Sequence, residues 1–333
     1  MNKSRLLGWS LLAFILYCTL GAAVYFASLL ALQKGVLLDV PWLVSTQKSL
    51  YRAGMGGKVN NWLGQRECIS PDPDLIYVPT HGTCAFEDIE FKTTLTFTGE
   101  GRETDAKPGG TGIAVIGDSH AMGWGVNDHE TFAAHLQTLS GHPVYNLGVA
   151  SYGTARELIR LEKSGVLDKV DTVILQYCNN DLNENLKFDT ASKQELHDRM
   201  FGAQPGNLPQ PSRLTLIAKG YGLTLAAPFR SLSESLRRKS FTRHYEPLIR
   251  VIAQHGDKLE GKRIIVIYSN SYGQKYRDFP SGPDARMPNV YFLDLNLARS
   301  DHHKLDNHMT PEGHRKAAER LFEYLQMPYA PNR

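Results

Sequence analysis

Residues 113–124 read Ile-Ala-Val-Ile-Gly-Asp-Ser-His-Ala-Met-Gly-Trp, and this stretch decides the fold of the chain. A short apolar run rich in β-branched residues that stops at Gly117 predicts a buried strand, followed by a turn into a helix. Ser119 lies at that junction, where a hydroxyl can attack an ester beside free backbone N–H groups. A plain tight turn and a phosphate-binding turn share this local pattern, so residues further along the chain must decide between them.

Strands and helices alternate after this stretch. The pattern predicts strands at residues 112–116, 143–147, 172–177, 263–268 and 290–293, and helices at residues 130–140, 154–163, 245–255 and 311–325. Such alternation implies parallel pairing, right-handed crossovers and helices on both faces of the sheet. We therefore expect a three-layer α/β/α sandwich with a flavodoxin-like parallel sheet, in which ligands bind beyond the carboxyl ends of the strands.

The rest of the chain divides around this pattern. We expect an N-terminal tip and membrane helix at residues 1–35, a juxtamembrane stalk or small β-containing segment at 36–110, and a catalytic domain at 111–328. The middle segment should contain a helix at 42–52, a linker at 54–64 and a half-buried strand at 91–98.

An insertion at residues 182–243 interrupts the alternation. Its loop contains Pro205, Pro209 and Pro211, and its apolar stretch is accompanied by basic residues, namely Arg213, Lys219, Arg230, Arg237 and Arg238. Three interpretations stay open: a cap over the substrate groove, a basic amphipathic surface on the membrane, or helices that extend the core.

No charged residue occurs from Leu6 to Leu32. As a helix this run reaches about 40 Å, which is enough to cross a hydrocarbon core of about 30 Å. A cleaved signal peptide is the alternative, although its apolar core would be about 7–15 residues long and no small-x-small cleavage site is clear. Lys3 and Arg5 precede the span, which favours a cytoplasmic N-terminus and an extracytoplasmic domain, periplasmic in a Gram-negative cell.

Composition and cysteines agree with this placement. The chain has 333 residues, 42% of them hydrophobic, and a formal net charge of +3, so it can bury a large core and is not disordered. The small, evenly spread charge argues against nucleic acid as a partner. Cys68 and Cys84 flank a loop rich in Pro and Asp and suit a disulfide in an oxidising compartment, with two reduced thiols as the alternative.

Four separated pieces carry the residue types of an ester-hydrolysing site. Ser119 offers a nucleophile, and a small-residue loop at 146–154 can bring a backbone N–H close to a substrate oxygen. Asn180 adds an amide donor, and Asp306 with His308 supplies a carboxylate and an imidazole just before the last helix. Histidine has the right intrinsic pKa to take the serine proton and return it to a leaving alcohol.

In this order the pieces resemble the SGNH, or GDSL-like, hydrolase family of the membrane-anchored bacterial type, over residues 112–325. The resemblance implies the SGNH hydrolase fold, with Ser119 as nucleophile, His308 as general base and Asp306 as the carboxylate that orients the imidazole. It also implies an oxyanion hole made by the backbone N–H of Ser119, the N–H of the second block and the side-chain amide of Asn180. No cofactor is implied.

Three positions depart from the family pattern. Ser151 stands where the second block usually has glycine; its own backbone N–H can serve if its φ/ψ allow it, and Gly153 or Gly148 can take the role instead. Cys178 stands where the third block usually has glycine. The Asp-x-His spacing is shorter than the commoner Asp-x-x-His, although both side chains can still face the site from a loop.

Several neighbours have a functional and a structural interpretation. Asp118 is expected to cap the turn after the first strand. His120, Trp124 and Tyr152 can line the substrate pocket or pack in the core. The remaining polar cluster, Asp301, His302, His303 and His314, has no spaced partner motif, so we expect no metal and expect the last of these to pack in the closing helix.

The expected function is a serine esterase that acts on O-acyl, above all O-acetyl, esters of a cell-envelope polysaccharide through an acyl-enzyme. The substrate would be an acylated glycan or another ester. Three alternatives stay open: an O-acetyltransferase that uses the same intermediate, sometimes beside a membrane-bound O-acyltransferase; a lipase or lysophospholipase at the membrane; and a non-catalytic scaffold subunit. The substrate is an expectation from analogy, because one fold supports many functions.

Overall fold

The computed structural model describes residues 3–55, 62–105, 108–188, 190–198, 212–236, 240–269 and 276–327. The expected linker at 54–64 lies mostly outside these residues. The same holds for the three prolines of the insertion and for two of its arginines, Pro205, Pro209, Pro211, Arg237 and Arg238.

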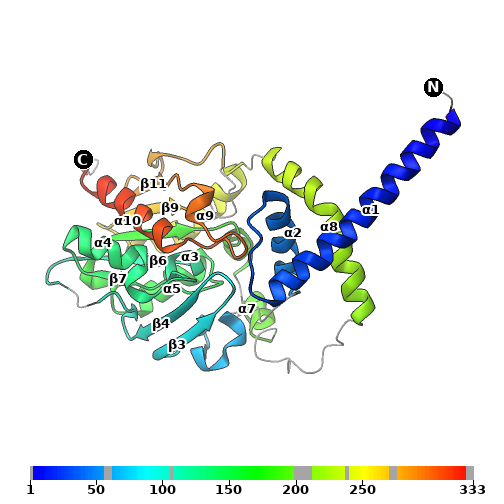
Figure 1. Ribbon diagram of the computed structural model, residues 1–333. Coiled ribbons are helices and arrows are strands. Elements are labelled where there is room, and N and C mark those ends of the chain that lie inside the picture. The colour runs from blue at the N-terminus through cyan, green and yellow to red at the C-terminus, as the bar shows by residue number, and fades with distance from the viewer. Residues whose placement is uncertain are drawn as a thin grey trace.

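A nine-stranded sheet forms the centre of the described structure, in the order β10-β11-β9-β8-β6-β7-β5-β4-β3 (Figure 1). Its strands are β3 (Gly82–Glu87), β4 (Lys92–Thr98), β5 (Gly101–Arg102), β6 (Gly112–Gly117), β7 (Val144–Asn146), β8 (Val170–Tyr177), β9 (Arg263–Tyr268), β10 (Gly282–Pro283) and β11 (Val290–Asp294). The five central strands pair in parallel. Counted along the chain, they stand in the flavodoxin-like order 2-1-3-4-5. The predicted fold class is confirmed.

Helices cover both faces of this sheet. Because successive side chains of a strand point to opposite faces, Ile113 and Val115 of β6 pack in one apolar core while Ala114 and Ile116 pack in another. The first core includes α4 (Phe132–Ser140) and α10 (Pro311–Leu325), and the second includes α5 (Thr154–Lys163) and α9 (Thr242–Gln254). Shorter helices complete the layers: α3 (Ser119–Met122), α6 (Asp181–Lys187), α7 (Thr190–His197) and the 3₁₀ turns Asp128–Glu130, Leu167–Lys169, Gly256–Lys258 and Arg299–Asp301.

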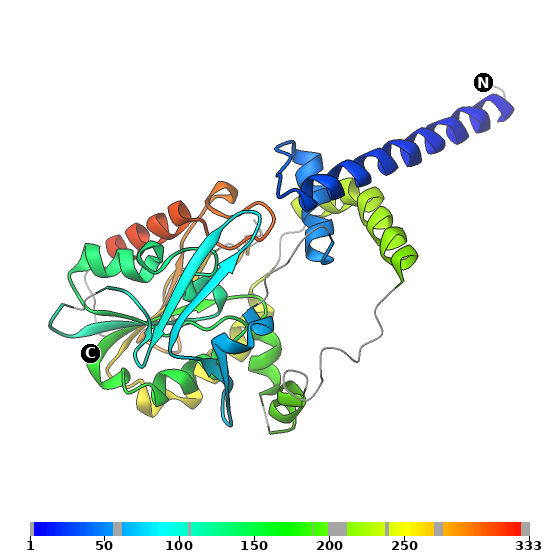
Figure 2. The ribbon, with the colours of Figure 1, turned by 60° about the horizontal axis from the view of Figure 1, so that its bottom comes forward.

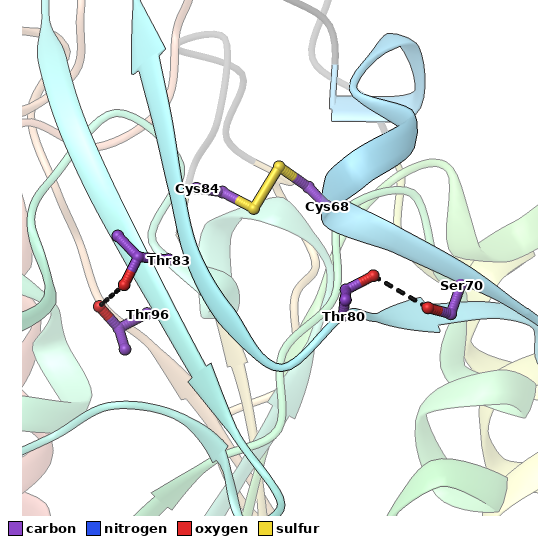
Figure 3. Close-up of a disulfide and its surroundings, with 6 residues drawn as sticks. All are labelled: Cys68, Ser70, Thr80, Thr83, Cys84 and Thr96. Atoms are coloured by element: carbon purple, nitrogen blue, oxygen red, sulfur yellow. Dashed lines mark hydrogen bonds between the residues drawn. A yellow bond between two sulfur atoms is a disulfide. The ribbon is translucent and has the colours of Figure 1, made fainter.

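The segment before residue 110 joins the same sheet. β5 pairs with β7 through Arg102 and Asn146, so β3, β4 and β5 continue the sheet as antiparallel strands across the expected boundary. A separate two-stranded sheet, β1 (Ile69–Asp72) and β2 (Ile76–Pro79), follows the 3₁₀ turns Trp62–Gly64 and Arg66–Cys68. A disulfide joins Cys68, just before β1, to Cys84 on β3 (Figure 3).

Three helices form a unit beside the sheet, α1 (Lys3–Gln33), α2 (Pro41–Arg52) and α8 (Arg213–Leu236). Both ribbon views show α1 projecting away from the sheet, and they show α8 lying against α1 (Figures 1 and 2). The Tyr221 hydroxyl donates to the Cys18 carbonyl at 2.7 Å, and a β-carbon at Gly21 would lie 2.4 Å from Leu225. Of the helices in the described ranges, α1 alone is long and apolar enough to cross a membrane, over Leu7–Gln33.

Candidate active site

The turn between β6 and α3 presents Ser119. The Asp118 side chain accepts from the His120 N–H at 2.9 Å, so Asp118 caps α3, as the sequence predicts. Gln176 of β8 holds the same turn, because its Oε1 atom accepts from the N–H groups of Asp118 at 3.3 Å and Ala121 at 3.0 Å. Nothing local in the sequence marks Gln176, since its partners lie in the turn after β6 and in α3, more than 50 residues away.

A hydrogen-bonded chain runs from Ser119 through His308 to Asp306. The Nε2 atom of His308 lies 2.7 Å from the Oγ atom of Ser119. The Nδ1 atom of His308 hydrogen-bonds with the Asp306 carboxylate, which also accepts from the His308 backbone N–H at 3.2 Å. The short Asp-x-His spacing therefore brings both side chains to the serine.

Electrostatics favour a charged Asp306 beside a basic imidazole. Burial opposes the protonated form of His308, but the charge and hydrogen bond of Asp306, helped by Asp118, outweigh it and raise the pKa of His308. Burial likewise opposes the carboxylate of Asp306, but the charge and hydrogen bonds of His308 outweigh it and lower the pKa of Asp306. An imidazole that takes a proton from Ser119 is stabilised by this arrangement.

Glu90 holds the loop that carries Asp306. Its carboxylate accepts from three consecutive backbone N–H groups, those of Lys304 at 2.6 Å, Leu305 at 2.7 Å and Asp306 at 2.9 Å. Hydrogen bonds from backbone N–H groups to an ionised carboxylate are among the stronger ones in proteins. Sequence reasoning missed Glu90, because no pattern links a carboxylate before β4 to a loop more than 200 residues later.

The same loop packs on the helical unit. The Asn307 side chain accepts a hydrogen bond from Lys48 of α2, and Asn307 has φ +76°. Leu305 is fully buried in a cluster of apolar residues from α1, α2 and the turn after α2, namely Tyr25, Leu32, Leu50, Tyr51 and Met55. The loop between Asp306 and His308 is thus fixed partly by the helices beside the sheet.

The second block approaches the site with Ser151 in the left-handed region, at φ +66°. Glycine favours this conformation, which explains why the family pattern usually has glycine at this position. The Ser151 carbonyl accepts from Arg156 at 2.6 Å. Asn180 lies against the same loop, since its amide donates to the Tyr152 carbonyl at 3.4 Å.

The two alternative glycines have packing reasons of their own. The Gly148 N–H donates to the Asn146 side chain at 3.1 Å, and a β-carbon at Gly148 would lie 2.4 Å from the Met122 nitrogen. A β-carbon at Gly153 would lie 2.8 Å from the Glu184 β-carbon. Gly148 therefore lets the loop approach α3, and Gly153 lets α5 approach α6.

The three candidate lining residues are buried, and two of them, His120 and Trp124, lie beside His308. The His120 ring lies 4.6 Å from the His308 ring, and burial, followed by the charges of His308 and His302, lowers the pKa of His120 well below its ordinary value. Trp124 packs between the rings of Phe86 and Phe91. Tyr152 donates to the Tyr77 carbonyl from within the core.

The second polar cluster makes structural hydrogen bonds. Asp301 accepts from the Ala298 N–H at 2.8 Å and from Lys316 at 2.6 Å. His314 is buried in α10, where its Nδ1 atom accepts from the Phe132 N–H at 3.0 Å. Within the described ranges, no three His, Cys, Asp or Glu side chains are grouped so that they could hold a metal ion.

No family model and no curated protein matches the sequence. The structure matches a G-D-S-L family lipolytic protein of Desulfitobacterium hafniense at 13% identity and TM-score 0.35, over 64% of this chain and 99% of that one. It matches a carbohydrate esterase family 2 enzyme of Corynascus thermopiles at 12% identity and TM-score 0.36, over 68% of each chain. It also matches an acetylxylan esterase of Geobacillus stearothermophilus at 13% identity and TM-score 0.33, over 68% and 99%. A likeness of this degree concerns the chain trace and extends to none of the activities named.

Proposed function

We propose that this protein is a serine esterase with Ser119, His308 and Asp306 as its catalytic residues. The observation that supports the proposal is the continuous hydrogen-bonded chain from the serine hydroxyl through the imidazole to the carboxylate. A serine needs a base within hydrogen-bond reach to become a nucleophile, and that base needs an orienting partner. The chain supplies both from one loop.

The proposed reaction uses each group in turn. The Ser119 oxygen attacks the acyl carbonyl while its proton passes to Nε2 of His308, and Asp306 stabilises the resulting imidazolium. His308 then gives the proton to the leaving alcohol, and water hydrolyses the acyl-enzyme with His308 again as base. The N–H groups of Ser119 and Ser151 and the amide of Asn180 would receive the oxyanion, where each donor is worth about 10²–10³ in rate.

We propose O-acetyl esters of a cell-envelope polysaccharide as the substrates. The rings of His120 and Trp124 support a short acyl group, because both are buried beside the His308 ring. A long acyl chain would need that space. The same acyl-enzyme would also allow transfer of the acetyl group to a substrate hydroxyl, alone or beside a membrane-bound O-acyltransferase.

We propose that α1 anchors the protein with its N-terminus in the cytoplasm and the sheet outside. The charges of Lys3 and Arg5 before the span support this orientation. The disulfide between Cys68 and Cys84 supports an oxidising compartment for the sheet (Figure 3).

Labelling with a fluorophosphonate probe tests the catalytic proposal. The full-length chain should label and release acetate from 4-nitrophenyl acetate, whereas Ser119→Ala should do neither. Ser70→Ala is a matched control, because the Ser70 hydroxyl pairs with Thr80 at the small sheet. Equal labelling of the wild type and the Ser119→Ala chain would contradict the role of Ser119, and a wild type that does not label would favour a non-catalytic subunit.

Hydrolysis of lipid esters is the second candidate, and α8 favours it. Leu214, Ile217 and Phe229 of α8 are exposed apolar side chains on the helix that packs against α1. A comparison of the turnover rates of acetylated glycans and of long-chain esters decides between the polysaccharide esterase and the lipase. Turnover of acetyl esters alone supports the polysaccharide substrate, and turnover of long chains alone supports the lipase.

A further inference from the structure

The loop after β7 is held at two successive backbone carbonyls by side chains from other elements. The Tyr77 hydroxyl donates to the Ala150 carbonyl at 2.5 Å, and the Nη2 atom of Arg156 donates to the Ser151 carbonyl at 2.6 Å. Both donor side chains are buried. The two peptide planes that flank the Cα atom of Ser151 are therefore both fixed.

These two contacts account for the backbone conformation of Ser151. The angles φ and ψ describe how the two flanking peptide planes are rotated about Cα, so contacts that fix both planes also restrict both angles. Ser151 has φ +66°, in the left-handed region. Such a conformation costs free energy in a residue other than glycine and persists only where the surrounding structure enforces it. Tyr77 and Arg156 enforce it here.

The contact with Tyr77 also sets the direction of the Ser151 N–H. The described residues contain no cis peptide bond, so the C=O of Ala150 and the N–H of Ser151 point in opposite directions. Tyr77 lies on the carbonyl side, and the N–H therefore points away from it. Ser151 is exposed between two buried neighbours. Within the described part of the chain no group accepts from its N–H, so this donor is available to a substrate oxygen.

Tyr77 is itself held in a fixed position. Its carbonyl accepts from the Tyr152 hydroxyl, and its ring packs edge-on against the Tyr152 ring with centroids 5.3 Å apart. It lies on β2 of the small sheet, which follows the disulfide between Cys68 and Cys84 (Figure 3). Burial raises the pKa of Tyr77 to about 12, so its hydroxyl keeps its proton and remains a donor wherever His308 can act as a base.

The contact comes from a part of the chain that the sequence did not connect with the site. Tyr77 belongs to the segment at 36–110, which was expected to be a stalk or a small β-containing segment. With Asn180 donating to the Tyr152 carbonyl at 3.4 Å, each of the three carbonyls at 150–152 accepts from one side chain. This segment therefore takes part in fixing the second block.

We propose that Tyr77 is a positioning residue for the oxyanion hole. By fixing the peptide between Ala150 and Ser151, its hydroxyl directs the Ser151 N–H toward the substrate oxygen, and Arg156 fixes the peptide on the other side of Ser151. This inference rests on the proposed esterase function and deepens it, because it names the group that orients one of the three oxyanion donors.

Tyr77→Phe in the full-length chain tests the role, because it removes the hydroxyl and keeps the ring. We expect kcat for 4-nitrophenyl acetate to fall about tenfold to a hundredfold with KM little changed, since the N–H remains but is no longer held in the productive direction. Hydrogen exchange of the backbone amides at 147–153, measured by mass spectrometry, should become faster, because one carbonyl of the loop is released.

Tyr245→Phe is the matched control. It also removes a partly buried tyrosine hydroxyl, which donates to Asp284 beside α9. Its kcat and its exchange at 147–153 should equal those of the wild type. Equal losses of kcat in Tyr77→Phe and Tyr245→Phe would reflect a general loosening of the fold and would overturn the role of Tyr77.

The two readouts separate this proposal from the esterase proposal. An active wild type together with a Tyr77→Phe chain of unchanged kcat would overturn the positioning role alone, whether or not the loop exchanges faster. A wild type that neither labels with fluorophosphonate nor hydrolyses 4-nitrophenyl acetate would overturn the esterase and this role together. A lower kcat with faster exchange at 147–153, both confined to Tyr77→Phe, would support the proposal.

Discussion

Ser151 has a left-handed backbone conformation, at φ +66°, which glycine adopts more easily than serine. We expect Ser151→Gly to raise the free energy of unfolding by about 0.5–1 kcal/mol, because the relief of strain exceeds the entropy that glycine adds to the unfolded chain. Esterase activity should change little, since the backbone N–H is kept. Urea unfolding and 4-nitrophenyl acetate hydrolysis check this. Ser164→Gly is the control, because Ser164 has φ −74° and should lose stability; an equal loss in Ser151→Gly would contradict the prediction.

Asp306 sets the proton affinity of His308. Because only neutral His308 can take the serine proton, we expect kcat/KM to fall as pH drops through a pKa above the ordinary histidine value of 6.5. Asp306→Asn removes the charge that raises this pKa, so the acid limb should move to lower pH. The plateau should fall by about 10³–10⁴. A pH–rate profile of both proteins measures the two effects, and an unmoved acid limb in the variant would contradict the assignment.

The residues brought together at the site were only partly predictable. Ser119, Asn180, Asp306 and His308 could be selected from sequence because catalysis restricts their types and their order along the chain. Glu90 could not, because a carboxylate that accepts backbone N–H groups leaves no local pattern and its partners are distant in sequence. The catalytic roles themselves stay predictions until Ser119 is tested.

At the scale of elements, β5 supports α3 through one buried side chain. Arg102 pairs with Asp128 at 2.8 Å and donates to the carbonyls of Met122, Gly123 and Val126, each at 2.6 Å. Arg102→Met would leave a carboxylate and three carbonyls without their donor. We expect it to lower the free energy of unfolding by about 3–5 kcal/mol and to reduce activity.

Thermal and urea unfolding of Arg102→Met measure this loss. Arg315→Met is the matched control, because Arg315 forms exposed ion pairs with Glu312 and Glu319 on α10. This substitution should lower the free energy of unfolding by only about 0–1 kcal/mol. Similar losses in the two variants would show that the buried arginine does not hold α3.

Glu90 is a positioning residue for the loop of Asp306. In Glu90→Gln an amide replaces the carboxylate that accepts three N–H groups, so we expect kcat to fall about tenfold to a hundredfold with KM little changed. The acid limb of the pH profile should also move to lower pH, because a less well positioned Asp306 raises the pKa of His308 by less. Glu87→Gln is the control, since Glu87 is exposed beside Lys92. A pure loss of stability with unchanged kcat would contradict the positioning role.

Elements with a strong period were predicted closely, and one short strand was not. The bounds of α5, β9 and α10 agree with the sequence to the residue, because apolar periodicity marks all three and Thr310 caps α10. The strand β5 and its pairing with β7 escaped prediction, because a strand of two residues is too short to show alternation. The segment before residue 110 therefore shares a sheet with β6, the strand that leads to Ser119.

At the scale of the molecule, Leu305 links the helical unit to the site. We expect Leu305→Ala to lower the free energy of unfolding by about 2–5 kcal/mol, because it leaves a cavity in a buried cluster. It should also lower kcat at temperatures where the chain stays folded, because Leu305 precedes Asp306. Leu321→Ala is the matched control, since Leu321 is equally buried but lies in α10. It should cost similar stability and leave kcat unchanged. Equal kcat values in both variants would contradict the link.

The contact between Leu305 and the first helices also bears on how the protein is made. Ser119 and His308, the proposed nucleophile and base, are 189 residues apart, and the loop of His308 packs on helices at the opposite end of the chain. A ribosome-bound or partly exported chain would already carry the serine but would still lack its base. If the chain is the membrane-anchored esterase proposed above, its activity would therefore begin only after the last part of the chain has reached the same side of the membrane.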